Sequence, residues 1–371
     1  MGIMVGLPSP SGSEKDLQLN FGKNMTVQVE MRAPHLPAEW HMQSGIQLTW
    51  PHAGTDWAYM LEEVQECFIR IAKEIAEREL LLIVTPEPEE VKKQISAVVN
   101  MDNVRFLKCA TNDTWARDHG AITMIDTGNP SLLDFTFNGW GLKFAAELDN
   151  QITKQAVEAG ALKGQYIDCL DFVLEGGSIE SDGMGTLLTT SECLLSPQRN
   201  GKLNQVELEE YLKSTFHLQK VLWLDHGYLA GDDTDSHIDT LARFCSTDTI
   251  AYVKCTDEAD EHYEALLAME EQLKTFRTLA GEPYRLLALP MADKIEEDGE
   301  RLPATYANFL ILNEAVLYPT YNQPENDRKA GEVLQQAFPK HQIIGIDCRA
   351  LIKQHGSLHC VTMQYPMGVL K

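Results

Sequence analysis

Hydrophobic positions along the chain change several times between helical and strand spacing. Between Met60 and Ile75, apolar residues recur every three or four positions, which predicts an amphipathic helix over about residues 56–79. A short strand at residues 40–50 is expected before this helix, and the continuous apolar run at residues 80–84 is typical of a buried strand.

After residue 85 the same order of elements recurs. Helices are expected near residues 89–98, 145–159, 205–215, 258–279 and 326–337. Strands are expected near residues 104–109, 121–125, 132–137, 172–195 (a hairpin), 221–224, 238–254 (a strand pair), 285–289, 306–312, 315–319, 343–346 and 357–366. About five rounds of helix, strand and hairpin, at a period of roughly 50–65 residues, predict an α/β propeller-type repeat. One such unit is too small to bury its apolar face, so the units are expected to pack round a common axis.

A single domain is expected over residues 31–371, because no linker-like break interrupts the repeats. Residues 1–30 include a stretch of Pro, Ser and Gly and are expected to form a flexible tail. This tail lacks a basic segment followed by a long apolar one, so no secretory signal is expected. The eight cysteines have no CxxC spacing, and reduced thiols in a cytoplasmic protein are therefore expected.

Acidic residues outnumber basic ones, with 55 Asp and Glu against 31 Lys and Arg and a formal net charge of -24. A negative field of this size disfavours binding to DNA, RNA and anionic membranes. No apolar run approaches the length of a membrane span. The expected partner is a small molecule, and the charge is compatible with a cationic one.

Several polar residues occupy comparable points of the repeats, at or just before the first strand of a hairpin. They are Asp118, Glu175, His237 with Asp239, and Cys360. If the units are arranged radially, these positions converge on the axis and bring together a thiol, an imidazole and three carboxylates. A cysteine beside a base is the arrangement that nucleophilic catalysis requires.

Each of these residues also has a structural explanation. Cys360 could be a buried structural cysteine, which is the common state of a single cysteine. The acidic segment around His237 could be a calcium loop, but Ile238 and Phe244 stand where such a loop needs Gly and Glu. A zinc site made of His237, Asp239 and Cys360 stays open as an alternative.

A thiol beside several carboxylates indicates a substrate that stays positively charged. A guanidinium does so, since its pKa lies above about 12, and its paired N–H groups fit carboxylates. A thiolate could attack the central carbon once the carboxylates hold the cation in place. Glycoside hydrolysis would use carboxylates without a thiol, and a cysteine protease would not need the extra carboxylates.

Six segments of the chain resemble the agmatine deiminases, which belong with the bacterial-type peptidylarginine deiminases in the guanidino-group-modifying, or pentein, superfamily. The segments are residues 36–40, 112–118, 137–141, 174–178, 231–239 and 358–360. They occur in the order expected for the family, and the likeness extends over nearly the whole chain. The resemblance implies a five-bladed α/β propeller with the active site on its axis, in agreement with the repeat pattern.

The resemblance implies that Cys360 is the nucleophile, that His237 is the general acid and base, and that Glu175 orients the imidazole and helps to hold the guanidinium. The thiolate would attack the guanidinium carbon while His237 protonates the departing ammonia, leaving an S-alkylthiouronium. His237 would then activate the water that releases a ureido product. No metal or organic cofactor is implied.

Residues for binding the substrate are implied in the same way. Asp118 and Asp239 would bind the guanidinium nitrogens, and Trp115 would wall the pocket and make a cation–π contact. Asp233, in the acidic segment that leads to His237, is a further candidate for binding substrate.

The expected activity is hydrolysis of agmatine to N-carbamoylputrescine and ammonia, a step of putrescine and polyamine biosynthesis. Alternatives are a deiminase of peptidyl-arginine or another guanidino compound, amidino transfer to an amine, and a non-catalytic propeller that binds a partner. Relatives of this kind are often dimers, so a homodimer is compatible with the resemblance. The chain departs from the family pattern at His119 and Ser357, which border the expected pocket and leave the substrate open.

Overall fold

The computed structural model describes residues 34–126 and 129–371. These residues belong to one compact unit, Arg32–Lys371. The tail expected at residues 1–30 lies outside the described residues, so it stays a prediction, as do the domain bounds, the homodimer and the cytoplasmic location. Among the helices of the described part, none is long and apolar enough to cross a membrane.

Five sheets of three or four strands form most of the β-structure within residues 34–126 and 129–371. In each sheet two neighbouring strands run antiparallel, and a further strand pairs with one of them in parallel. In spatial order the sheets are β18 (Thr362–Pro366), β1 (Gln43–Thr49), β2 (Leu80–Thr85) and β3 (Val104–Lys108); β4 (Ile122–Asp126), β5 (Asn129–Thr136) and β6 (Gln165–Val173); β7 (Ile179–Ser181), β8 (Thr186–Thr190) and β9 (Lys220–Leu224); β10 (Ala242–Ser246), β11 (Thr249–Lys254) and β12 (Arg285–Pro290); β15 (Leu310–Ile311), β16 (Ala315–Thr320) and β17 (Gln342–Asp347). A separate two-stranded pairing joins β13 (Glu296–Glu297) and β14 (Glu300–Arg301).

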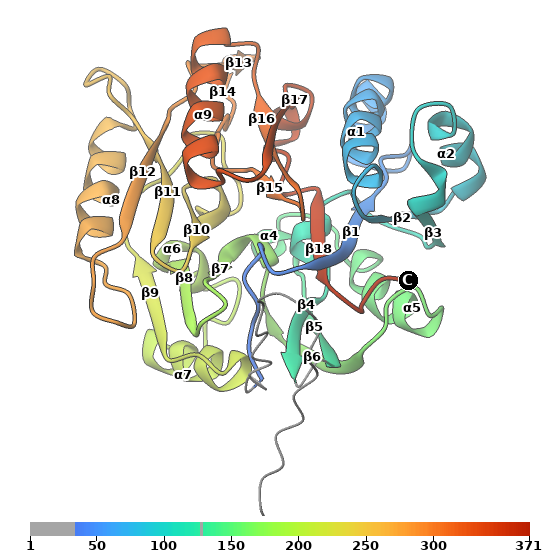
Figure 1. Cartoon of the computed structure of the whole chain (residues 1–371), viewed down its shortest axis with the longest axis horizontal. Helices are drawn as coiled ribbons and strands as arrows, with labels where there is room; N and C mark the ends of the chain where they lie inside the picture. Colours follow the sequence, from blue (N-terminus) through green and yellow to red (C-terminus); the bar gives the residue numbers. More distant parts are fainter. Residues whose placement is uncertain (1–33, 127–128) are drawn as a thin grey trace, which may run out of the picture. The chain divides into compact units, whose positions relative to one another are not determined.

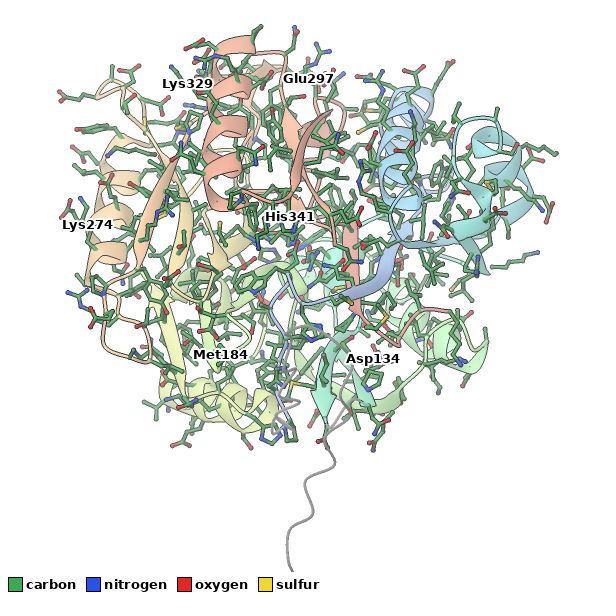
Figure 2. The ribbon with its side chains drawn as sticks, in the orientation of Figure 1. Asp134, Met184, Lys274, Glu297, Lys329 and His341 are labelled. Atoms are coloured by element: carbon green, nitrogen blue, oxygen red, sulfur yellow. The ribbon has the colours of Figure 1, made fainter. Side chains whose placement is uncertain are left out.

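The longer helices connect strands that pair in parallel. They are α1 (Leu61–Ala76), α2 (Pro88–Ile95), α5 (Ile152–Glu158), α7 (Gln205–Phe216), α8 (Tyr263–Thr275) and α9 (Pro324–Ala337). Figure 1 shows the five sheets grouped round the middle of the unit, with these helices on its outer side. Lys274 of α8 and Lys329 of α9 project outward into solvent (Figure 2), so the polar face of each helix is the exposed one.

Short helical turns lie between the sheets. They are α3 (Ala116–His119), α4 (Gly139–Leu142) and α6 (Ser191–Leu194), and the 3-10 helices η1 (Asp56–Met60), η2 (Met101–Asn103), η3 (Asp149–Gln151), η4 (Gly176–Ser178), η5 (Ile238–Thr240) and η6 (Leu351–Gln354). Several of them stand immediately before the first strand of a sheet, which is where the sequence places the candidate catalytic residues.

The α/β class is confirmed, and the five sheets of the described chain match the expected rounds. Two local predictions are wrong. The strand β6 is absent from the expected elements, because Asp168 and Asp171 interrupt its alternation on an exposed edge strand. The strand expected from residue 238 begins later, because the backbone N–H and hydroxyl of Thr240 both donate to the carbonyl of His237 and close the turn η5.

The C-terminal strand β18 pairs with β1 and not with its neighbours in the sequence. The pairing is antiparallel, with Gln47 opposite Met363. The first sheet therefore contains both the first and the last strand of the described chain. Cys360 lies just before β18, so this closure determines where the candidate nucleophile is placed.

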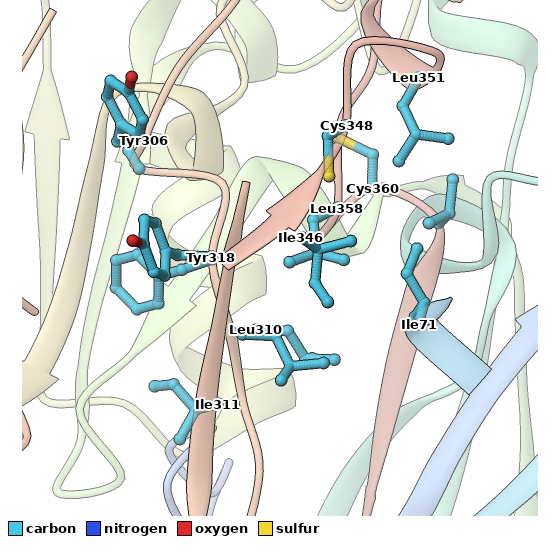
Figure 3. Close-up of a cluster of buried hydrophobic side chains, with 14 of the residues drawn as sticks. Ile71, Tyr306, Leu310, Ile311, Tyr318, Ile346, Cys348, Leu351, Leu358 and Cys360 are labelled. Carbon is cyan, nitrogen blue, oxygen red and sulfur yellow. The ribbon is translucent and has the colours of Figure 1, made fainter. Parts of the chain in front are cut away.

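The segment that carries Cys360 is anchored in the largest apolar cluster. Figure 3 shows Cys360 and Leu358 beside Cys348 and Leu351, within a cluster that also includes Ile71 of α1. Leu358 and Leu351 are completely buried. Packing on both sides of the nucleophile therefore restricts the backbone that presents it.

Gly45, in the middle of β1, leaves no room for a side chain. A Cβ built there lies 2.1 Å from the carbonyl oxygen of Leu80 on β2. We expect Gly45→Ala to lower the free energy of unfolding by about 1–3 kcal/mol, because the β2 backbone must move. Urea titration measures the change, and Gly54→Ala, at an exposed loop position, is the control. An unchanged urea midpoint for Gly45→Ala would contradict the tight pairing of β1 with β2.

Candidate active site

The turns that precede the five sheets of the described chain meet at one point. They carry Asp118 on α3, Glu175 before η4, Asp239 on η5, Asn308 before β15 and Cys360 before β18. All five side chains are buried. The thiol sulfur of Cys360 lies 3.4 Å from Asn308 Oδ1 and 4.0 Å from Asp239 Oδ2. The convergence expected from four units is therefore present, and a fifth unit joins it through Asn308.

Cys360 is a neutral thiol in the free protein. Burial raises its pKa well above the usual range, and the carboxylates of Asp239 and Asp118 raise it further. The thiol can donate to the side-chain oxygen of Asn308. A positive charge brought beside the sulfur would lower this pKa and favour the nucleophilic thiolate.

The other seven cysteines are also buried, so burial does not identify the nucleophile. It also raises the pKa of Cys193 and of Cys348 well above the usual range. What distinguishes Cys360 is its position between Asn308 and Asp239, at the point where the turns meet.

His237 is buried and neutral. Burial lowers the pKa of its imidazole to about 3. Its Nδ1 lies 3.7 Å from Asp118 Oδ1, and within the described part of the chain its Nε2 has no hydrogen-bond partner. A neutral imidazole with an open nitrogen can accept a proton, as a general base must.

The carboxylates of the site repel one another. Trp140 Nε1 donates to Asp118 Oδ2 at 2.9 Å, and the backbone N–H of Gly177 donates to Asp118 Oδ1 at 3.0 Å. Even so, burial and then the charges of Asp239 and Glu175 raise the pKa of Asp118 well above its usual range. Asp239 Oδ1 is buried without a partner among residues 34–126 and 129–371. A cation with several N–H groups would complement this arrangement.

Glu175 is paired with Arg199, which the sequence did not single out. Arg199 Nε donates to the two carboxylate oxygens of Glu175 at 2.8 and 3.0 Å, and the guanidinium also contacts Asp235 at 2.6 Å. Burial raises the pKa of Glu175 and Arg199 opposes this, so the pair favours an ionised carboxylate inside the protein. Ligand atoms of Glu175 and His237 lie within 4.8 Å of each other. The role of Glu175 in orienting the imidazole stays a prediction.

Trp115 lies between two other tryptophans. Its ring centroid is 5.7 Å from that of Trp57 and 5.9 Å from that of Trp140. Its indole Nε1 donates to Asp113 Oδ2 at 3.2 Å. Gly356 abuts the ring, because a Cβ at this glycine would lie 2.1 Å from Trp115 Cζ3. The predicted wall of the pocket is therefore held on several sides.

Three other residues of interest have different surroundings. Asp233 is partly exposed, and its carbonyl accepts a hydrogen bond from Lys143 Nζ. His119 Nε2 lies 3.4 Å from Thr49 Oγ1. The hydroxyl of Ser357 lies 3.0 Å from the Tyr321 hydroxyl. The two departures from the family pattern, His119 and Ser357, are thus buried within the protein and have internal polar neighbours.

Several functional candidates were missed at the level of sequence. Asn308 could have been found, because it occupies the same point of its repeat as the other site residues, just before the first strand. Glu39 and His359 lie within segments that resemble the family but carry no signal of their own. Arg199 and Arg243 have no distinguishing pattern, and only their buried contacts reveal them.

Two sets of His, Cys and carboxylate side chains in the described residues are close enough to bind a metal. They are Glu175, Cys193 and His237, and Glu39, Glu180 and His359. Arginine already occupies the carboxylates of both sets, Arg199 in the first and Arg243 in the second. A metal ion in either set would meet this fixed positive charge at short range. The zinc set of His237, Asp239 and Cys360, considered from the sequence, is not among them.

The raised pKa of Cys360 predicts slow alkylation of the free protein at neutral pH. We expect the rate with iodoacetamide to rise about tenfold per pH unit from about pH 7 to 9 without a plateau, because only the thiolate reacts. Peptide mass spectrometry follows Cys360, with Cys193 and Cys348 as buried references in the same digest. A plateau below pH 8 would show that the thiol ionises more easily than its surroundings imply.

Comparison with known proteins is in agreement with this geometry. A model of the Porphyromonas-type peptidyl-arginine deiminase family matches residues 35–366. The agmatine deiminase of Ectopseudomonas mendocina is 31% identical over 356 residues, covering 90% of this chain and 95% of the relative.

Two solved structures are similar over nearly their full length. A cysteine-to-serine variant of C. jejuni agmatine deiminase with substrate bound is 39% identical, has a TM-score of 0.84 and covers 94% of this chain and 100% of its own. A Porphyromonas gingivalis protein provisionally named an arginine deiminase is 50% identical, has a TM-score of 0.86 and covers 91% and 100%. The chain therefore belongs to the Porphyromonas-type peptidyl-arginine deiminase family.

Proposed function

We propose that this protein hydrolyses agmatine to N-carbamoylputrescine and ammonia through a covalent intermediate on Cys360. The observation that carries the proposal is a neutral thiol between mutually repelling buried carboxylates, Asp118 and Asp239. Similarity to agmatine deiminases supports agmatine as the substrate. The ureido product would be a precursor of putrescine, so the reaction belongs to polyamine biosynthesis.

A guanidinium fits the site in charge and in shape. Its planar N–H groups suit carboxylate oxygens, and Asp239 Oδ1 is a buried acceptor without a partner in the described chain. Its positive charge would also relieve the repulsion that raises the pKa of Asp118. Because a guanidinium stays charged at physiological pH, binding needs no change in its protonation.

In the first half of the reaction, the bound cation lowers the pKa of Cys360, and the neutral imidazole of His237 accepts the thiol proton. The thiolate forms a carbon–sulfur bond to the guanidinium carbon, and the π electrons of the carbon–nitrogen bond move onto nitrogen. His237 then returns the proton to one –NH2 group, which leaves as ammonia. A positively charged S-alkylthiouronium remains on Cys360.

In the second half, water attacks the thiouronium carbon while His237 takes one of its protons. Collapse of the adduct breaks the carbon–sulfur bond and forms the carbonyl of the ureido product. The proton on His237 converts the Cys360 thiolate back to the thiol. The second water proton is released, so that the ammonia of the first half leaves overall as ammonium.

Two neighbouring residues support this sequence of steps. Glu175, held by Arg199, is placed to orient the imidazole of His237 as it gains and loses a proton. Trp115 offers an aromatic face to the substrate cation. Asp233 is our candidate for the outer part of the pocket, because its carboxylate carries charge on the segment that leads to His237.

A deiminase of peptidyl-arginine or of another guanidine is the second candidate. It would use the same thiol chemistry and would differ in what holds the far end of the substrate. The name of the family model and that of the Porphyromonas gingivalis relative favour this alternative. Competing substrates therefore have to be compared directly.

Agmatine, arginine and an arginine-containing peptide, supplied separately, should be distinguished by the enzyme. We expect ureido product and ammonia in equal amounts from agmatine, and much lower kcat/KM for the other two. Cys360→Ala should abolish turnover, because no other nucleophile lies at the site, whereas Cys255→Ala is a control outside it. Turnover by Cys360→Ala would contradict the mechanism, and turnover of only another guanidine would contradict the substrate.

Gly356→Ala tests the wall of the pocket. The added Cβ would displace Trp115, which cannot move freely because it packs between Trp57 and Trp140. We expect kcat/KM for agmatine to fall by about 100-fold, the scale of loss that a displacement near 1 Å causes. Steady-state kinetics measures the change, with Gly54→Ala as control. Wild-type kinetics in a folded Gly356→Ala protein would remove Trp115 from the pocket.

A further inference from the structure

His359, directly before the nucleophile, lies between two carboxylates. Its Nδ1 is 2.8 Å from Asp239 Oδ2, and its Nε2 is 2.8 Å from Glu39 Oε2. All three side chains are buried. We refer to Asp239, His359 and Glu39 as the His359 trio. It connects the site of Cys360 to polar residues farther inside the protein.

The two short contacts of the trio each require a hydrogen atom. An ionised carboxylate can only accept hydrogen bonds, and a neutral imidazole has a single N–H. With one proton on the ring, one contact would place two lone pairs against each other at 2.8 Å. The trio therefore holds two shared protons.

Both carboxylates of the trio are stabilised in the ionised form. Glu39 accepts from the backbone N–H of Ile311 at 2.7 Å and from the guanidinium of Arg243. Burial alone would raise the pKa of Glu39, but Arg243 and His359 lower it. Burial would likewise raise the pKa of Asp239, and the hydrogen bond and charge of His359 lower it. The second proton therefore belongs on the ring and not on a carboxyl group.

Opposing charges act on the imidazole itself. Burial, Arg117 and Arg243 lower the pKa of His359, whereas Glu39 and Asp239 raise it. The two hydrogen bonds decide this balance, because only the imidazolium can make both. Removing either carboxylate would therefore release the second proton.

We propose that His359 is a positioning residue, an imidazolium held between Glu39 and Asp239 that keeps the Asp239 carboxylate ionised and correctly turned toward the substrate. The inference rests on the proposed function. Asp239 Oδ2 accepts from His359 and lies 4.0 Å from Cys360 Sγ. Its other oxygen, Oδ1, has no partner in the described chain and is thereby left for a guanidinium N–H.

Charged groups on several elements face the trio and hold it in place. Arg117 on α3 donates to the carbonyl of His359 at 3.4 Å. Arg243 on β10 lies 3.1 Å from His359 Nε2 and donates to Glu39 and to Glu180 of β7. His237 and Cys360 complete the titratable surroundings of Asp239. A change of charge at His359 is therefore transmitted mainly to Asp239 and Glu39.

A small cavity gives the trio a route for proton exchange. Its volume is about 60 Å³, and Glu39 and His359 line it together with Arg117, Met363 and Gln364. A polar space of this size can hold a few water molecules. The trio can therefore equilibrate its protons with water without passing through the substrate.

The test compares the pH dependence of kcat/KM for agmatine in the wild type, His359→Asn and His359→Leu. Asn keeps an N–H for Asp239 but has no charge, and Leu supplies neither. In wild type Asp239 stays ionised as pH falls, because its pKa is lowered. In His359→Asn burial dominates, the pKa of Asp239 rises, and the carboxylate gains a proton on the acid side.

We expect the acid limb of His359→Asn to move up by roughly one pH unit or more, a tenfold loss of kcat/KM near pH 6 that shrinks above pH 8. His359→Leu should lose activity over the whole range. His226→Asn, at an exposed histidine, is the matched control and should keep the wild-type profile. An equal loss at every pH in the Asn and Leu variants would overturn the inference, because a merely structural role predicts that result.

A second measurement does not depend on turnover. In protein labelled with 15N-histidine, proton–nitrogen correlation spectra at pH 7 should show one buried imidazole with both ring nitrogens protonated, and this signal should vanish in His359→Asn. A bare ring nitrogen at His359 would overturn the inference. If the signal is present but wild type does not turn over agmatine, the proposed function fails and the assignment of His359 stands.

Discussion

The antiparallel pairing of β18 with β1 is the contact on which the rest of the site depends. It joins the last strand of the described chain to the sheet that contains the first. Cys360 stands in the turn just before β18, while the carboxylates it faces come from turns before other sheets. Closure of this sheet therefore couples completion of the fold to completion of the site. The nucleophile has a defined position only when the whole unit has folded.

Burial of negative charge is the second constraint. Asp118, Glu175 and Asp239 lie close together where water is excluded, and burial and mutual repulsion oppose their ionisation. Arg199 compensates Glu175, and His359 compensates Asp239. The charge that remains uncompensated favours a cation in the same place. A site arranged in this way discriminates by charge before any contact with the rest of the substrate matters.

The pattern of the sequence was sufficient to place much of this site. Repeat register put Asp118, Glu175, Asp239 and Cys360 at equivalent points, and the structure brings them together. This inference succeeds because the order of strands and helices follows from local periodicity, and equivalent points of equivalent units meet on one axis. Asn308 obeys the same register, but an amide carries no charge that would mark it among the other asparagines.

The sequence by itself determined the α/β class, the repeated order of elements and the residue types that meet at the centre. Only the tertiary structure decided which cation accompanies which carboxylate: Arg199 with Glu175, and Arg243 and His359 with Glu39. The physical reason is that pairing depends on distances of a few ångströms between side chains from different sheets, and protonation depends on their burial. Neither quantity is encoded in the local pattern of the chain.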